Sequence, residues 1–230
     1  MDISFSPHFT KYEKLLAKAD DAFEQVKNEF PDCVKCKIQC YDCCNALFDL
    51  ALIEALYINY HFNRNFNGEE KDRVINQADI ADRKVYKLKK KAYNDLKSGK
   101  DQNEIMIQTA SERIRCPLLT DKNECALYEF RPITCRVYGI PTVIDGNGHT
   151  CGLSGFIEGE KYPSVNFDII QKKLYDISCE LVKNINSKYS KLGEILVPLS
   201  TAILTVYDDE YLGIKIPEKK SLKKTGEDNA

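Results

Sequence analysis

The sequence has no long apolar run and no strong excess of charge of either sign. No stretch approaches the roughly 20 apolar residues that cross a bilayer, and the opening MDISFSPHFTKYEK lacks the basic and then apolar segments of a secretory signal. The net charge of −2 gives no general attraction to nucleic acid or to an anionic membrane. We therefore expect a cytoplasmic protein without a membrane partner, and no nucleic-acid partner unless a local patch supplies one.

Groups that would identify an enzyme are also scarce. The chain has 3 histidines, and none lies in a pattern with carboxylates that suits acid–base catalysis. The glycines that follow a predicted strand do not open a helix, so they do not form a nucleotide-binding loop (Gly146, Gly148, Gly152 and Gly155). Whether the protein is an enzyme therefore stays uncertain from the sequence.

Cysteine, in contrast, is abundant, with 10 residues in a chain of 230. Disulfides are rare in a reducing compartment, so we favour metal ligation over disulfide bonding for most of these thiols. The length suits one domain, which we place at residues 1–216 with a cysteine-rich core at 33–152. The lysine-rich tail, residues 217–230, is predicted to be disordered.

Apolar spacing predicts a mainly α fold, a helical domain that encloses a cysteine-ligated metal site. Helices are expected at residues 10–30, from Cys44 or Asn45 to His61, and at 69–97, 102–114, 165–188 and 197–206. The second of these is apolar on all sides, which indicates burial at the centre of the domain. Residues 115–155 read as a loop-rich segment with a small β-hairpin: a strand at 137–144, a turn at 145–148 and a return strand near Thr150.

Lysines crowd the polar side of the predicted helix at 69–97: Lys84, Lys87, Lys89, Lys90 and Lys91. A run of this kind usually marks a solvated helix face. We favour that interpretation over a surface for nucleic acid or for an acidic protein.

Five cysteines lie close together after the first helix: Cys33, Cys36, Cys40, Cys43 and Cys44. A separation of two intervening residues occurs twice, and it lets two thiolates turn back onto one metal. Neighbouring side chains diverge by about 100° on a helix, so Cys43 and Cys44 are expected to have different roles.

Four more cysteines lie in the proline-containing loops of the second half: Cys116, Cys125, Cys135 and Cys151. This context favours ligation for all four. Cys179 falls within an amphipathic helical pattern and is predicted to be a buried free cysteine. His149 could ligate a metal, but we favour an exposed histidine in a turn.

Three arginines adjoin the distal thiols: Arg115, Arg131 and Arg136. They could stabilise the negative charge of a thiolate-ligated cluster. Equally, they could pair with nearby carboxylates (Asp121, Glu124 and Glu129), and the sequence leaves both possibilities open.

These motifs resemble the YkgJ-type cysteine-cluster proteins, which are described as carrying a zinc- or iron-chelating domain with about eight cysteines. The resemblance covers residues 33–152 and rests on three features: the run Cys36-x3-Cys40-x2-Cys43-Cys44, Cys116-Pro-Leu, and the segment from Tyr128 to Arg136 that contains Arg131-Pro132-x2-Cys135-Arg136. It implies a metal site drawn from Cys36, Cys40, Cys43, Cys44, Cys116, Cys125, Cys135 and Cys151. Cys33 is an extra cysteine upstream of this pattern.

Eight candidates exceed the four ligands of one zinc or one cubane cluster. The chain therefore holds either two centres, or one centre with additional structural or redox cysteines. The scattered distant thiols and the arginines favour a [4Fe–4S] cluster over zinc.

The expected function is that of a metal-binding protein with a structural or redox centre and a possible protein partner. A related cysteine cluster in flagellin lysine N-methylases suggests a group-transfer enzyme as the alternative. A carrier that hands metal to other proteins is a third possibility.

Overall fold

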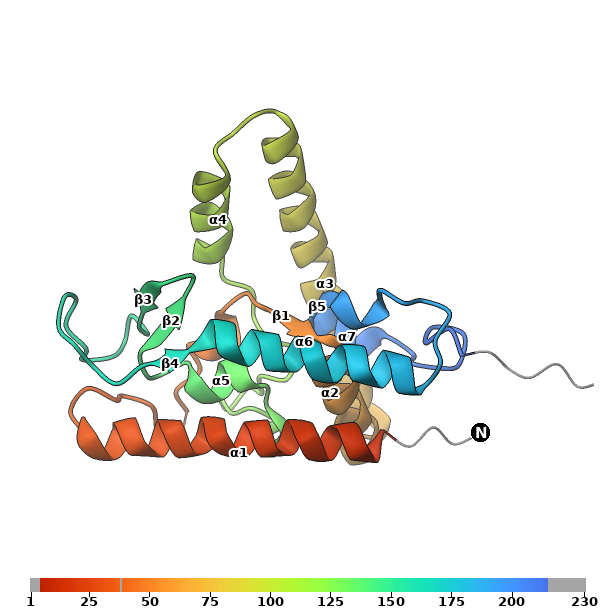
Figure 1. The fold of residues 1–230 in the computed structure, drawn as a ribbon, viewed down its shortest axis with the longest axis horizontal. Helices are drawn as coiled ribbons and strands as arrows, with labels where there is room; N and C mark the ends of the chain where they lie inside the picture. The colour runs from red at the N-terminus through yellow and green to blue at the C-terminus, as the bar shows by residue number, and fades with distance from the viewer. Residues whose placement is uncertain (1–4, 38, 215–230) are drawn as a thin grey trace, which may run out of the picture.

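The computed structural model describes residues 5–37 and 39–214, and within them the fold is mainly helical, with five short strands (Figure 1). The mainly α prediction is confirmed at this level. None of the helices in these residues combines the length and apolar character needed to cross a membrane. The predicted disordered tail, residues 217–230, lies outside the described residues.

The first helix, α1 (Ser6–Glu29), runs along one side of the molecule beside α6 (Phe167–Asn184) (Figure 1). Its apolar positions recur every three or four residues and bury one face, which includes Tyr12 and Leu16. Helix α6 begins two residues later than predicted because Val165–Asn166 forms β4, which pairs with β2 (Thr142–Ile144) in parallel.

The predicted helix from Cys44 or Asn45 to His61 was wrong over its first third. Cys43–Asn45 forms a single 3₁₀ turn, η1, and Asp49–Ala51 forms strand β1. Strand β1 pairs with the distant β5 (Leu196–Pro198), a partner that a local hydrophobic pattern cannot reveal. Helix α2 (Leu52–Asn65) follows, and its first turns are fully buried at the centre of the domain, as expected.

Strand β5 also takes the first residues of the helix predicted at 197–206, so α7 spans only Leu199–Leu204. Helix α7 packs between α2 and the first part of α3 (Gly68–Lys97). A second, shorter helix, α4 (Gln102–Ser111), folds back along α3, and the two form a hairpin that stands out from the body (Figure 1). Helix α4 ends three residues earlier than predicted.

The segment 115–155 contains more helix than the sequence suggested. A 3₁₀ turn, η2 (Tyr128–Phe130), leads into α5 (Ile133–Val137), which begins directly after Pro132. The strand predicted at 137–144 is therefore confined to β2. The predicted hairpin is confirmed, with a shorter turn than predicted: β2 pairs with β3 (Asn147–His149) through Asp145 and Gly146 alone, whose φ values are 48° and 77°. Asn147 and Gly148, predicted as turn, belong to the return strand.

Candidate metal centre

A cavity of about 810 Å³ opens between α1, α5 and the loop that precedes α2, and its walls hold eight of the ten cysteines. The eight are those that the family resemblance implies: Cys36, Cys40, Cys43, Cys44, Cys116, Cys125, Cys135 and Cys151. All ten cysteines are free thiols. Segments more than 100 residues apart in the chain thus bring their thiols to one place.

Backbone hydrogen bonds join the two halves of this cavity. The amide of Cys116 donates to the carbonyl of Cys44 at 2.7 Å, and the amide of Ile114 donates to the carbonyl of Asn45 at 3.1 Å. These two bonds hold η1 against the start of the loop-rich segment. The first cysteine cluster is therefore anchored directly to the second.

A tight reversal of the chain then brings Cys125 back beside Cys116. Leu119 and Cys125 form an antiparallel bridge, and the amide of Ala126 donates to the carbonyl of Leu118 at 2.8 Å. Asn123 has a φ of 61° in this turn, a conformation that asparagine tolerates better than most residues. The position of Cys125 follows from this local turn.

Helix α5 carries Cys135 into the cavity, and a buried carboxylate fixes the start of that helix. Glu54 of α2 is 2% exposed and accepts hydrogen bonds from the amide of Ile133 at 3.2 Å and the hydroxyl of Tyr12 at 3.1 Å. Burial raises the pKa of Glu54 to about 7, against the opposing effect of these hydrogen bonds. Glu54 is the one acidic side chain of an otherwise apolar buried segment, a signal in the sequence that we did not use.

Five of the thiols form what we call the inner group: Cys43, Cys44, Cys116, Cys125 and Cys135. Hydrogen bonds from the thiols of Cys135 and Cys44 lower the pKa of Cys43 to about 3, and the nearby charge of Arg131 acts in the same direction. The same hydrogen bonds raise the pKa of Cys44 and Cys135, and burial raises that of Cys116 to about 12. The inner group therefore favours one thiolate supported by neutral thiols.

Cys43 and Cys44 were expected to differ in role because adjacent side chains diverge. In the structure both thiols line the same cavity, but their acidities differ: the pKa of Cys43 is lowered and that of Cys44 is raised. The 3₁₀ turn thus brings both sulfurs to one cavity.

The remaining three thiols, with one carboxylate, form the outer group: Cys36, Cys40, Cys151 and Asp42. These residues also line an adjoining hollow of about 480 Å³. The thiol of Cys151 donates to Asp42 at 3.6 Å, and burial raises the pKa of Cys36 to about 11. Asp42 was absent from our predictions, although it directly precedes Cys43 in the sequence.

Gly139 makes room for Cys36. A Cβ atom at residue 139 would lie 2.1 Å from the sulfur of Cys36, far inside van der Waals contact. Only glycine lets this sulfur sit against the backbone there.

Two cysteines and one histidine lie away from the cavity. Cys33, a predicted ligand, sits in the turn after α1, where its carbonyl accepts a hydrogen bond from the amide of Gly155 at 2.8 Å. Cys179 is on α6, half-buried rather than fully buried as expected. His149 is exposed on β3, as favoured from the sequence.

The three arginines differ in their partners. Arg136 is 8% exposed and donates to Asp20 and to the carbonyls of Arg131 and Glu129. Arg115 donates to the carbonyl of Thr120 at 2.9 Å and lies 3.9 Å from Asp121. Both are therefore occupied by other protein groups, and for Arg136 the carboxylate is Asp20 rather than one that the sequence suggested.

Arg131 is the arginine that faces the sulfurs. Its guanidinium carbon lies 3.9 Å from the centre of the Tyr128 ring, and its charge lowers the pKa of Cys43 and Cys125. Its buried Nε–H finds no hydrogen-bond acceptor among the described residues. A buried donor of this kind costs free energy unless an acceptor is supplied, so it fits an anionic, sulfur-ligated group in the cavity.

As the side chains stand, no three His, Cys, Asp or Glu residues in the described part of the chain meet in a position to hold a metal ion. The thiols share one cavity and the chemistry that soft metals require. No family model, curated protein or solved structure matches this chain. The resemblance to the YkgJ-type proteins therefore stays a prediction.

Proposed function

We propose that this protein binds a thiolate-ligated metal centre in the cysteine-lined cavity, a [4Fe–4S] cluster in preference to zinc. The observation that carries the proposal is the gathering of eight of ten cysteines, from distant segments, on the walls of one cavity. Free cysteines that serve only as small apolar residues have no reason to collect around a cavity. Thiolates that share a soft metal do.

The inner group is the proposed ligand set. It offers five thiols where a zinc ion or a cubane cluster takes four, so one of the five is an accessory. Arg131 supports this choice, because its charge and its buried Nε–H both suit the net negative charge of a cluster with four thiolates. A bound cluster would supply electron transfer or a structural link between the two halves of the site.

The outer group is the proposed neighbour of this centre. Three sulfurs make a donor set that zinc accepts, and Asp42 adds one carboxylate oxygen beside them, since its other oxygen pairs with Arg113. A second metal there would correspond to the possibility of two centres. In the alternative, these three thiols line the access route to a single centre.

A group-transfer enzyme is the second candidate function, and the size of the cavity favours it. A volume of about 810 Å³ falls in the range of pockets that hold small-molecule ligands. Apolar side chains also line this cavity, among them Phe48, Val85 and Leu199. A substrate or methyl donor could therefore bind beside the centre. Titration calorimetry with S-adenosylmethionine tests this candidate, and the absence of binding removes the methylase version of it.

Purification of the full chain without oxygen tests the main proposal. We expect the broad visible absorption of an iron–sulfur cluster and equal amounts of iron and acid-labile sulfide. Zinc without iron would support metal binding by the same thiols but replace the cluster with the alternative. A protein that holds neither metal after reconstitution with iron and sulfide, or with zinc, would overturn the proposal.

Single substitutions locate the ligands. Cys43→Ala and Cys135→Ala each remove a thiol of the inner group and should lower metal content sharply. Cys33→Ala and Cys179→Ala are matched controls outside the cavity and should keep it. Equal metal loss in all four variants would show that loading depends on folding rather than on the inner group.

A further inference from the structure

The hairpin of α3 and α4 provides a surface that the metal proposal does not use. We call its outer part, residues 86–111, the arm. Burial along α3 ends at Val85, and α4 has no buried residue. The predicted apolar stripe continues to Leu96, but that side chain is 53% exposed because the arm has left the body of the protein (Figure 1). The arm thus has no packing role over most of its surface.

Positive charge is concentrated on the α3 side of this hairpin. Residues 84–100 contain seven lysines and one aspartate, a net charge of +6, so the rest of the chain carries −8. Two of the lysines are neutralised by ion pairs, Lys89 with Asp49 at 2.7 Å and Lys100 with Asp95 at 2.9 Å. The other five form no ion pair among the described residues: Lys84, Lys87, Lys90, Lys91 and Lys97. The outer half of α3 is therefore strongly basic, while the arm as a whole (residues 86–111) carries +3, because Asp101 and Glu104 offset part of this charge.

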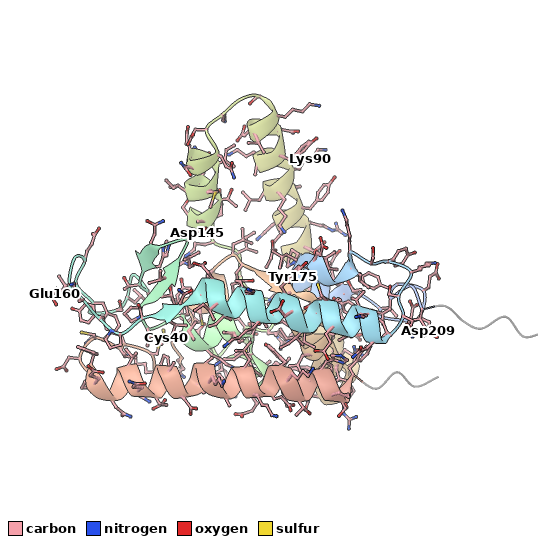
Figure 2. The ribbon with its side chains drawn as sticks, viewed as in Figure 1. Cys40, Lys90, Asp145, Glu160, Tyr175 and Asp209 are labelled. Carbon is pink, nitrogen blue, oxygen red and sulfur yellow. The ribbon has the colours of Figure 1, made fainter. Side chains whose placement is uncertain are left out.

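Two exposed tyrosines alternate with two of these lysines along one line. Tyr86, Lys90, Tyr93 and Lys97 are separated by four, three and four residues, which places them on one face of the helix. Tyr86 is 62% exposed and Tyr93 is 64% exposed. Figure 2 locates Lys90 on the arm, away from the body of the protein. We call these four residues the tyrosine–lysine stripe.

The sequence alone favoured a solvated face for these lysines, but the two exposed tyrosines among them change that interpretation. We propose that the tyrosine–lysine stripe binds single-stranded nucleic acid. Ammonium groups contact phosphates, and exposed aromatic rings between them stack on unpaired bases, which is the combination that binds single strands without strong sequence preference. The tyrosines are about 10 Å apart along the helix axis, at 1.5 Å per residue, so they would engage bases that are not adjacent. This binding is additional to the metal centre and does not depend on it.

The positive charge of the stripe and the exposure of its two tyrosines together favour single-stranded nucleic acid over other partners. A second copy of the chain would bring two basic arms together, and like charges repel. Duplex nucleic acid keeps its bases stacked and would leave both tyrosines without a partner. An acidic protein would satisfy the lysines but has no bases for the rings, so it becomes an outcome of the test.

Fluorescence anisotropy with labelled 20-nucleotide strands of mixed sequence tests the proposal on the 230-residue chain as purified. RNA and DNA of the same sequence are compared, together with the corresponding duplexes. We expect single strands to bind more tightly than duplexes, and binding to weaken as salt rises. Absence of binding to either single strand at low salt would overturn the proposal.

Two double variants separate stacking from charge. Tyr86→Ala with Tyr93→Ala should weaken binding by at least about fivefold per tyrosine, the lower end of base–aromatic stacking. Lys90→Gln with Lys97→Gln should reduce the slope of log K against log salt by about 1.4, at about 0.7 for each phosphate contact on a single strand. All four positions are exposed, so the variants should fold, which circular dichroism checks.

Matched substitutions on α6 provide the controls. Lys172→Gln with Lys173→Gln removes the same charge from an exposed helix in the body, and Tyr175→Ala removes an exposed tyrosine there (Figure 2). These controls should bind like the wild type, and equal losses would overturn the assignment to the arm. If polyglutamate competes as well as RNA, and the tyrosine variant binds normally, the surface serves an acidic protein and the nucleic-acid proposal is wrong.

Discussion

Replacement of Glu54 by glutamine should flatten the dependence of stability on pH. Glu54 is fully buried between α1, α2 and α5, and burial raises its pKa from 4.5 to about 7. A glutamine side chain has nearly the same shape and keeps an oxygen that can accept from Ile133 and Tyr12. The substitution therefore removes the titration while it preserves the hydrogen bonds.

The direction in which the free energy of unfolding changes with pH follows from the direction of the pKa shift of Glu54. Between pH 4.5 and 7 the folded protein holds a proton on Glu54 that the unfolded chain has released, so the free energy of unfolding falls as pH rises. The contribution of Glu54 is fully present below pH 4.5 and is lost above about pH 7. A difference of about 2.5 pH units corresponds to a loss of about 3 kcal/mol.

Urea unfolding at several pH values between 4.5 and 8, in one reductant, measures this loss. We expect the Glu54→Gln curve to lack the fall that the wild type shows. Tyr12→Phe should act in the opposite direction, because it removes a hydrogen bond that stabilises the carboxylate and so raises the pKa of Glu54 further. If the wild type and Glu54→Gln gave parallel curves, the buried carboxylate would not be the source of the pH dependence.

Three more predictions concern the packing and reactivity of single residues. Gly139→Ala places a Cβ atom 2.1 Å from the sulfur of Cys36, which is the free end of an exposed side chain, so it should displace that thiol with little change in the midpoint of unfolding, as measured by thiol labelling and urea unfolding. Gly193→Ala brings its Cβ within 2.8 Å of the Cα of Cys179, a backbone atom that cannot rotate away; it should lower the midpoint of unfolding without a change in metal content, and a wild-type midpoint would contradict the contact. In metal-free protein, Cys43 should react with iodoacetamide even near pH 5, because its pKa is lowered to about 3, and mass spectrometry that finds Cys36 modified first would contradict this order.

Most of the helices could be predicted from the sequence, because the spacing of apolar residues along a helix is a local property. The buried face of α1 and the central position of α2 follow directly from the spacing of apolar residues. The β2–β3 hairpin follows from Asp145 and Gly146, which suit a two-residue turn. Each of these predictions depends on residues close together in sequence.

The errors occurred where a distant partner overrides the local pattern. Asp49–Ala51 reads as helix, but it becomes β1 because Leu196–Pro198 lies beside it. The arm shows the reverse case, since the apolar stripe of α3 predicts burial as far as Leu96 and the body of the protein ends near Val85. Spacing identifies an apolar face, but it does not show how much of that face is covered.

For the proposed site, the sequence alone indicated the main donor chemistry: a surplus of thiols in a chain with few histidines, which makes sulfur the principal proposed ligand. Only the tertiary structure separated the inner group from the outer group, excluded Cys33 from the cavity and placed Arg131 against the sulfurs. Those outcomes depend on the pairing of η1 with residues 114–116 and on the contact of Glu54 with α5. Both join segments more than 60 residues apart, and spacing along the chain carries no information about them.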